Sequence, residues 1–363
     1  MNVIKIITWF YKAKYLWILL FSLLLPSLVF SSTFNVTTTQ EFRAALTNSA
    51  GNGESDTINL AAGTYKTTDD SLGTFTFLDN EDFDLTIEGV SADTSILSGD
   101  DQNRVLSFNV VGSTAEIVFE KVSVLNGLTT TNGGGVYSKE NFTCKHCIFR
   151  NNEAPNGGGL YVERENHAII ENSSFTDNKA NYGGAIQFGY LVNPVIRNST
   201  FISNQASSGG AIYLRSSYGT EIKNSMFRAN SAGVGGAIYQ AFIGVTVIKS
   251  SVFADNIGIR SEAAIAFSYL YSELLIANSI FYGNLSNELN DPNYPAGREA
   301  IGIYGGYGNS IEIVNTAIVN NSGGVRLSGF DENTSISNTV FSNNSYSDVT
   351  IEDSTIPSII NSY

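Results

Sequence analysis

Basic side chains recur at a fixed spacing in the middle of the sequence. Lys145, Arg197, Lys223 and Lys249 are separated by one or two steps of the same interval, and Glu171 fills the remaining position of the series. Such groups can take up a proton from a substrate or hold an acidic one. A column of charge is also the ordinary solvated face of a sheet, so both interpretations stay open. We name Arg197, Lys223 and Lys249 as candidate binding residues.

Carboxylates that work as an acid and base pair must lie about 5–10 Å apart. Asp177 and Asp255 share a repeat position, but three strand spacings between them make about 14 Å. The chain has 2 His and 2 Cys, which is little for a structural zinc site. We therefore expect no catalytic residue, no metal site and no cofactor.

Cys144 and Cys147 form a C-x-x-C pair, a spacing that can support thiol redox chemistry. Other copies of the repeat have Ile and Ser at these two positions, which favours a pair of buried free thiols. A disulfide between Cys144 and Cys147, permitted in an exported protein, is the alternative.

Three tyrosines follow a glycine-rich box at the same repeat position. Tyr161, Tyr213 and Tyr239 alternate with apolar residues and so point to the outer face, with Gln187 at the equivalent position between the first two. Aromatic side chains provide much contact area at low entropic cost, which suits binding surfaces. Stacked rings can equally serve to stabilise adjacent strands. Tyr161, Tyr213 and Tyr239 complete the candidate binding residues.

The element that must position all these residues is a sequence repeat of about 26 residues. Each copy has a large apolar residue, which we call the anchor, followed three positions later by asparagine. The anchors are Phe149, Phe175, Phe201, Phe227, Phe253, Phe281, Ile318 and Phe341, and the asparagines are Asn152, Asn178, Asn204, Asn230, Asn256, Asn284, Asn321 and Asn344.

Each repeat offers short β-type segments separated by Asn or Gly, with no helical period. Strands this short must pair with the equivalent strand of the next repeat, about 4.8 Å away. The sequence therefore predicts an all-β fold, a single-stranded right-handed parallel β-helix of about a dozen coils. A short helix over Thr39–Asn48, preceded by a Thr cap, is expected to cover its first coil.

The chain divides into four segments. Residues 1–31 have the positive start and short apolar run of a signal peptide. Residues 32–118 are the cap and irregular first coils, residues 119–345 the regular repeats, and residues 346–363 a C-terminal cap or tail. With 34 acidic and 20 basic residues the formal charge is −14, and the acidic balance excludes an ordinary nucleic-acid binder. No transmembrane segment is expected after signal cleavage.

The two boxes, Phe-x-x-Asn and Gly-Gly-Ala-Ile, recur in phase at Phe175, Phe201 and Phe227. In this the chain resembles the polymorphic outer membrane protein repeat family, whose passenger regions are right-handed β-helices associated with adhesion. No strands of an autotransporter barrel are expected after Phe341. The segment from Ser32 to Leu106 is similar to the start of pectin-lyase-like proteins, a fold that includes polysaccharide lyases and glycoside hydrolases.

This resemblance implies an exported, non-catalytic, adhesin-like or passenger-like protein that is secreted or held at the cell surface or outer membrane. Its partner is expected to be a surface glycan or a host or partner protein, bound through the flat faces. The alternative is a secreted polysaccharide lyase or glycoside hydrolase of the pectin-lyase-like class.

Overall fold

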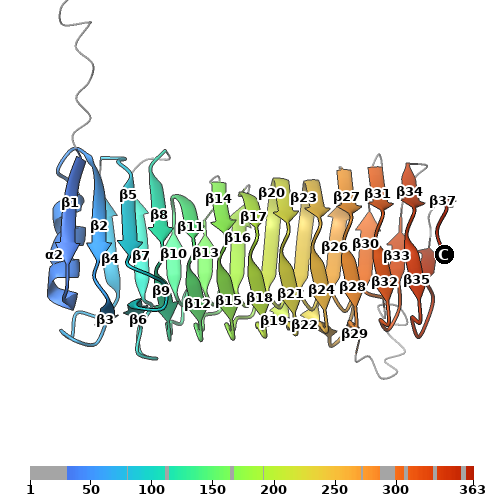
Figure 1. The fold of residues 1–363 in the computed structure, drawn as a ribbon, viewed down its shortest axis with the longest axis horizontal. Helices are drawn as coiled ribbons and strands as arrows, with labels where there is room; N and C mark the ends of the chain where they lie inside the picture. Colours follow the sequence, from blue (N-terminus) through green and yellow to red (C-terminus); the bar gives the residue numbers. More distant parts are fainter. Residues whose placement is uncertain are drawn as a thin grey trace, which may run out of the picture.

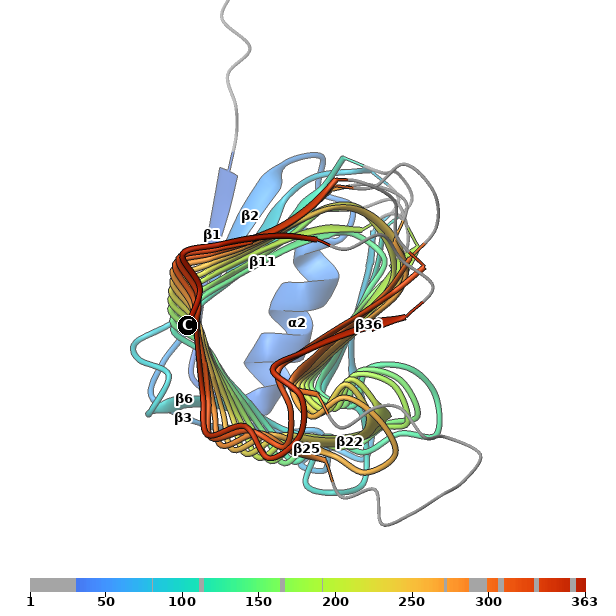
Figure 2. The ribbon, with the colours of Figure 1, turned by 90° about the vertical axis from the view of Figure 1, so that its right-hand side faces the viewer.

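The computed structural model describes residues 31–363 except residues 80, 111–113, 164–166, 191, 271–272, 287–298, 306–309, 330–332 and 353–356. Apart from Ser31, the expected signal peptide lies outside these residues. The described chain is a parallel β-solenoid whose coils follow one another along a rod (Figure 1). Viewed along the rod, three faces enclose the interior, and a helix lies across the N-terminal end (Figure 2).

Each complete coil contributes one strand to each face, and every pairing between coils is parallel. Face 1 consists of β1 (Ser31–Val36), β2 (Ser55–Leu60), β5 (Leu85–Gly89), β8 (Glu116–Glu120), β11 (Asn141–Lys145), β14 (His167–Glu171), β17 (Asn193–Arg197), β27 (Glu273–Ala277), β31 (Ser310–Val314), β34 (Thr334–Ser337) and β37 (Ser358–Ile360). Face 2, which carries the anchor residues, consists of β3 (Gly63–Lys66), β6 (Ser95–Ser98), β9 (Ser123–Leu125), β12 (Ile148–Arg150), β15 (Ser174–Thr176), β18 (Thr200–Ile202), β21 (Met226–Arg228), β24 (Val252–Ala254), β28 (Ile280–Tyr282), β32 (Ala317–Val319) and β35 (Val340–Ser342).

Face 3 follows the glycine-rich box in each regular coil. It consists of β4 (Phe75–Asp79), β7 (Leu106–Val110), β10 (Val136–Ser138), β13 (Leu160–Val162), β16 (Ile186–Tyr190), β26 (Ile265–Leu270), β30 (Ile301–Gly305), β33 (Val325–Ser328) and β36 (Val349–Glu352). Two long strands, β20 (Ile212–Lys223) and β23 (Ile238–Lys249), run through from face 3 to face 1. A small sheet of β19 (Gln205–Ser208), β22 (Ser231–Val234), β25 (Ile257–Gly258) and β29 (Leu285–Ser286) lies between faces 2 and 3 in the chain.

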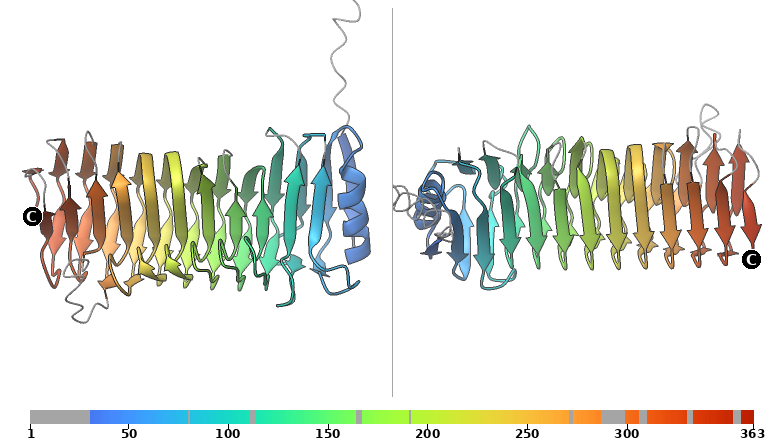
Figure 3. Two further views of the ribbon diagram at one scale, coloured as in Figure 1. Left: turned by 180° about the vertical axis from the view of Figure 1, so that it is seen from behind. Right: turned by 90° about the horizontal axis from the view of Figure 1, so that it is seen from above.

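The predicted all-β solenoid with a capping helix is thus confirmed. Face 2 contains 11 strands, close to the dozen coils expected. The predicted helix is α2 (Thr39–Ser49), the one α-helix among the described residues, and Thr38 forms the expected cap. It covers the first coil at the end of the rod (Figure 3).

Two columns of repeated residues, one of mostly phenylalanine and one of asparagine, run through the interior. The anchor phenylalanines stack ring on ring, with centroids 4.7 Å apart between Phe201 and Phe227 and planes within 3°. Beside them the buried asparagines form an amide ladder, in which Asn204 Nδ2 donates to Asn230 Oδ1 at 2.9 Å. The ladder begins where Gly127 N donates to Asn152 Oδ1, and ends where Asn344 Nδ2 donates to Asp348 Oδ1.

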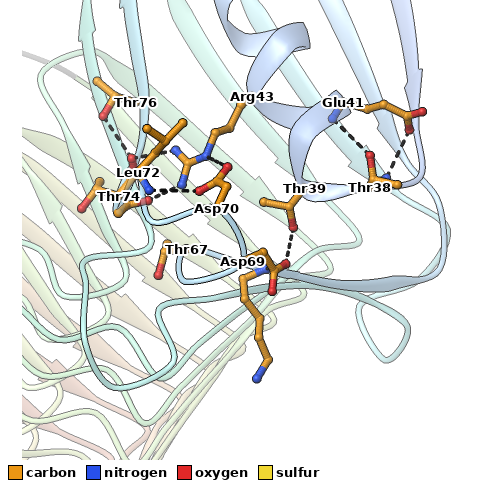
Figure 4. Close-up of polar contacts among 12 residues, drawn as sticks. Thr38, Thr39, Glu41, Arg43, Thr67, Asp69, Asp70, Leu72, Thr74 and Thr76 are labelled. Atoms are coloured by element: carbon orange, nitrogen blue, oxygen red, sulfur yellow. Dashed lines mark hydrogen bonds and ion pairs between the residues drawn. The ribbon is translucent and has the colours of Figure 1, made fainter.

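A mostly buried arginine helps to fix the capping helix to the first coils (Figure 4). Arg43 Nε pairs with Asp70 at 2.5 Å, its Nη1 donates to Thr74 O, and its guanidinium lies 4.5 Å from the centre of the Phe75 ring. Burial alone would raise the pKa of Asp70, but Arg43 and the Leu72 amide hold it below its ordinary value.

We expect Arg43→Ala to destabilise the cap by about 3 kcal/mol, because it leaves a mostly buried carboxylate without its partner. Amide hydrogen exchange should accelerate in α2 and the first coils while the central coils keep their protection. Lys179→Ala, which breaks an exposed pair with Glu153, is the control and should have little effect. Unchanged exchange in α2 of the Arg43 variant would contradict the role given to this contact.

Candidate functional site

The three predicted tyrosines lie on face 3 with their side chains half-buried. The strand register places Gln187 between Tyr161 and Tyr213. Tyr213 stacks on Tyr239, with ring centroids 5.4 Å apart. Tyr161 stacks instead on Tyr137, 5.8 Å away. Sequence analysis did not name Tyr137 as a site residue, although it holds the same position after its glycine box.

Within each stacked pair the rings turn their faces to one another along the rod, so these faces are largely covered. Tyr182 packs edge-on against Tyr213 at 5.0 Å, and Tyr137 Oη donates to Glu163 Oε2 at 2.6 Å. Burial raises the pKa of Tyr213 to about 12, so its hydroxyl stays protonated at neutral pH. This column therefore offers hydrogen-bond donors and acceptors more than open ring faces.

The predicted basic residues lie on face 1, around the corner from the tyrosines. The register aligns Arg197, Lys223 and Lys249 in one column. Arg197 and Lys223 both pair with Glu221, at 3.4 and 3.2 Å. Partial burial raises the pKa of Glu221, but Lys223 and Arg197 outweigh it and keep the carboxylate ionised. The column is thus partly neutralised.

The structure does not bring the two predicted sets into one cluster. Tyr213 and Lys223 stand near opposite ends of the 12-residue strand β20, which turns the corner between faces 3 and 1. On this corner lies a group that sequence analysis missed, which we call the corner ridge: Tyr190, Arg215, Tyr218 and Phe242. Tyr218 is 69% exposed, Phe242 51% and Tyr190 45%. Tyr190 and Phe242 stand two repeat periods apart, but Ser216 occupies the position between them, so the sequence shows no unbroken aromatic column here.

Cys144 and Cys147 are both buried free thiols in this structure. Cys144 Sγ donates to Ser173 Oγ at 3.3 Å, and Cys147 Sγ lies 3.3 Å from Lys145 O. Burial raises the pKa of the Cys144 thiol well above its ordinary value. A buried thiol with a raised pKa is a poor nucleophile.

A second group missed from the sequence lies at the C-terminal end of face 3. Glu262, in the loop before β26, replaces the glycine of the box and is fully buried. Its carboxylate accepts hydrogen bonds from Ser261 and Tyr304. Its side chain also fills the space over Gly302, where a Cβ would lie 2.2 Å from the Glu262 side chain. In the sequence, the sign of this group is that Glu262-Ala263 stands where the other coils have the two glycines of the box.

Further charged groups lie near Glu262 and its partner Tyr304. Glu299 is 6% exposed and accepts from Thr350 Oγ1, while Arg326 is 6% exposed and pairs with Glu352. Glu299 Oε2 and two guanidinium nitrogens of Arg326 have no hydrogen-bond partner among the described residues. Paired carboxyls can perform acid–base chemistry, but Glu262 and Glu299 are both covered and offer no open surface to a substrate.

Burial raises the pKa of Glu262, with Glu299 adding to the shift. Because the folded-state pKa lies above the unfolded value of about 4.3, this group favours folding below that value and loses its contribution as pH rises through the folded pKa. We expect Glu262→Gln, which imitates the protonated carboxyl, to raise the melting temperature at pH 7–8 and to flatten its fall between pH 4 and 8. The exposed Glu312→Gln is the control and should preserve the wild-type profile. The same profile in both variants would refute this assignment.

No helix among the described residues is long and apolar enough to cross a membrane. Within the same part of the chain, no three His, Cys, Asp or Glu side chains are grouped so that they could hold a metal ion.

Comparison with known proteins identifies the architecture. Residues 84–256 match the family model described as right handed beta helix region. The fold is a right-handed β-helix. Its parallel coils and three faces are of the pectin-lyase-like type. No curated protein matches this β-helix.

Solved structures similar to this β-helix include carbohydrate-active enzymes. A mannuronic acid specific polysaccharide family 6 lyase from human gut microbiota is 10% identical over 88% of this chain and 83% of its own, with a TM-score of 0.44. The PL6 family alginate lyase AlyGC is 15% identical over 84% of this chain and 44% of its own, with a TM-score of 0.49. The catalytic unit of a thermostable GH87 alpha-1,3-glucanase from Streptomyces thermodiastaticus strain HF3-3 is 12% identical over 93% of this chain and 69% of its own, with a TM-score of 0.47. Likeness at this level concerns the fold and not the reaction.

Proposed function

We propose that this β-helix is an exported, non-catalytic protein of the cell surface or outer membrane that binds glycan through its outer faces, in the manner of an adhesin or passenger. The observation that carries the proposal is the outer surface of β20 and its neighbours. It presents the half-buried side chains of Tyr161, Tyr213 and Tyr239, each with a hydroxyl group, on one side of a corner and Arg197, Lys223 and Lys249 on the other. Sugar hydroxyls both donate and accept hydrogen bonds, and such a surface can satisfy them.

Two further observations support a binding role without catalysis. The six residues of this surface include no pair of carboxylic acids such as glycoside hydrolysis needs, and Arg197 and Lys223 are both engaged by Glu221, which they hold ionised. The covered pair of Glu262 and Glu299 lies at the far end of the same face. Export rests on the N-terminal sequence, with its lysines and short apolar run.

The test is to present the purified mature protein with a panel of acidic and neutral glycans and to record both binding and chain cleavage. We expect binding without cleavage, and loss of most of it in the double variant Tyr213→Ala, Tyr239→Ala. The matched control is Tyr282→Ala, which removes an exposed tyrosine from face 2.

Two results would contradict the proposal. If no glycan binds, or if the double variant binds as well as the control, the tyrosine column is not a glycan-binding surface. A protein would then be the preferred partner of this β-helix. Cleavage that is abolished by Arg197→Ala or by a chelator would establish the alternative, a secreted polysaccharide lyase or glycoside hydrolase.

A further inference from the structure

We propose that this β-helix pairs with a second copy of itself, with the two rods antiparallel and face 2 of one packed against face 2 of the other. The contact is the apolar strip, which we define as the two outward residues of each strand from β18 to β35, on either side of the anchor. These six strands follow one another in a row along the rod (Figure 1). The candidate glycan-binding residues lie on faces 1 and 3, so the inference does not rest on the proposed function.

The strip is apolar although the repeat does not demand this. Among its residues only Thr200, Arg228 and Ser342 are neither aliphatic nor aromatic. The charge of Arg228 is balanced by Asp255 on the adjacent bend, 3.4 Å away. In β15, earlier on the same face, both outward residues carry hydroxyl groups, so polar residues fit this position. A contiguous apolar patch on an outer surface is typical of a contact with another macromolecule.

Exposure alternates from strand to strand along the strip. In β18, β24 and β32 both outward residues are half-buried, whereas in β21, β28 and β35 both are exposed. The residue before the anchor protrudes at Met226, Ile280 and Val340, which are 39%, 45% and 46% exposed. Val252 and Ala317, at the same place in β24 and β32, are less exposed. The strip therefore consists of three ridges that alternate with three grooves.

This alternation fits a second copy in one orientation. The midpoint of the strip lies between β24 and β28. A two-fold axis at this point, parallel to the strands, reverses the rod and places every ridge of one copy over a groove of the other. Ile280 then lies over the partner's Val252, and Met226 over the partner's Ala317. A closed dimer of parallel rods would instead set each strand against its own copy, so that ridge would meet ridge.

The dimensions of the strip also suit a dimer. Both copies have the same strand spacing of about 4.8 Å, so ridges and grooves stay in phase over the whole length. Another protein would need that same spacing to fit as well. Six strands make the strip about 29 Å long and, with the bend residues, about 17 Å wide, which is on the order of 500 Å² per subunit. The total of about 1,000 Å² is near the lower limit for specific interfaces, so we expect a reversible dimer of micromolar affinity.

Sedimentation velocity of the full mature protein tests the dimer over a concentration range of about 1–200 µM. We expect the dimer fraction to rise with concentration. Ile280→Lys should weaken the dimer at least about tenfold, because each dimer would then bury two unpaired ammonium groups. The matched control is Leu78→Lys, at an exposed apolar residue on face 3, which should dimerise like the wild type. Both substitutions are at exposed positions, so both melting temperatures should stay close to that of the wild type.

A pair of opposite charges tests the antiparallel arrangement. Met226→Lys and Ala317→Glu should each weaken self-association. An equimolar mixture of the two variants should dimerise better than either alone, because antiparallel packing places residue 226 of one variant over residue 317 of the other. Parallel rods would set residue 226 against residue 226 and would give no such gain.

Three results would overturn the inference. A wild-type protein that stays monomeric at the highest concentration would rule out the dimer and leave the strip to a different protein. Equal association of Ile280→Lys and Leu78→Lys would show that the contact lies outside the strip. A mixture of the charged variants that associates no better than its components would refute the antiparallel packing. Glycan binding is measured separately and is not decided by any of these results.

Discussion

Replacing Phe201 with alanine should lower the free energy of unfolding by about 3–5 kcal/mol. The ring is fully buried and lies between those of Phe175 and Phe227, with centroids 5.1 and 4.7 Å away. Both neighbours would lose a stacking partner. The cavity could not close, because backbone pairing on all three faces holds the coils at the strand spacing. The loss should therefore reach the upper part of the range for a buried aromatic residue.

Urea unfolding followed by circular dichroism measures this effect, and hydrogen exchange shows how far it spreads along the rod. Phe341→Ala is the control, because that ring occupies the same repeat position but is only partly buried at the C-terminal end. Phe341→Ala should lower the free energy of unfolding clearly less than Phe201→Ala. An equal loss in the two variants would mean that the phenylalanine column does not support the central coils.

Replacing Asn204 with leucine should lower the free energy of unfolding by a similar amount, although leucine has a similar volume. Asn204 Oδ1 accepts from both the backbone N and the Nδ2 of Asn178, each at 3.0 Å, and its own Nδ2 donates to Phe175 O at 3.0 Å. All these groups are buried. Each one left without a partner costs about 1–3 kcal/mol, so the loss should be at least about 3 kcal/mol in total.

The matched control for this substitution is Asn198→Gly. Asn198 also repeats every coil, but it is exposed and its backbone lies in the left-handed region. That conformation suits glycine. Its replacement should change stability by less than about 1 kcal/mol. If Asn204→Leu proves as mild as Asn198→Gly by the same urea titration, then the ladder does not contribute as described.

The sequence was sufficient for the parts of the fold that repeat. A column such as Phe175, Phe201 and Phe227 can be read without coordinates, because stacking in register demands the same residue at the same spacing. The spacing could not distinguish the two asparagine columns, however. Asn198 turns the chain in the left-handed region, whereas Asn204 is buried in the amide ladder. Telling them apart requires knowing which side of the bend faces the interior.

The candidate surface was predictable only in part for the same reason. Tyr213 and Lys223 repeat with the coil and were found, but their separation by a corner depends on how β20 bends. Tyr218 has Val192 and Gly244 at the equivalent positions of the neighbouring coils, and Ser216 stands between Tyr190 and Phe242, so neither position forms a continuous column that the period would reveal. The Glu262 group was visible only as a loss of glycine, and its burial depends on Gly302 in the next coil.

The amide ladder has one further consequence, which concerns the length of the rod. Its amides all donate toward the C-terminal coils, so each central coil ends in the same hydrogen-bonding pattern with which the next begins. Only the two ends differ, with Gly127 as the first donor and Asp348 as the last acceptor. For the ladder alone, the coils between them are equivalent, because excision or duplication of one complete central coil restores every bond of the ladder. Gene recombination can therefore adjust the reach of this protein in whole steps, without redesigning either end.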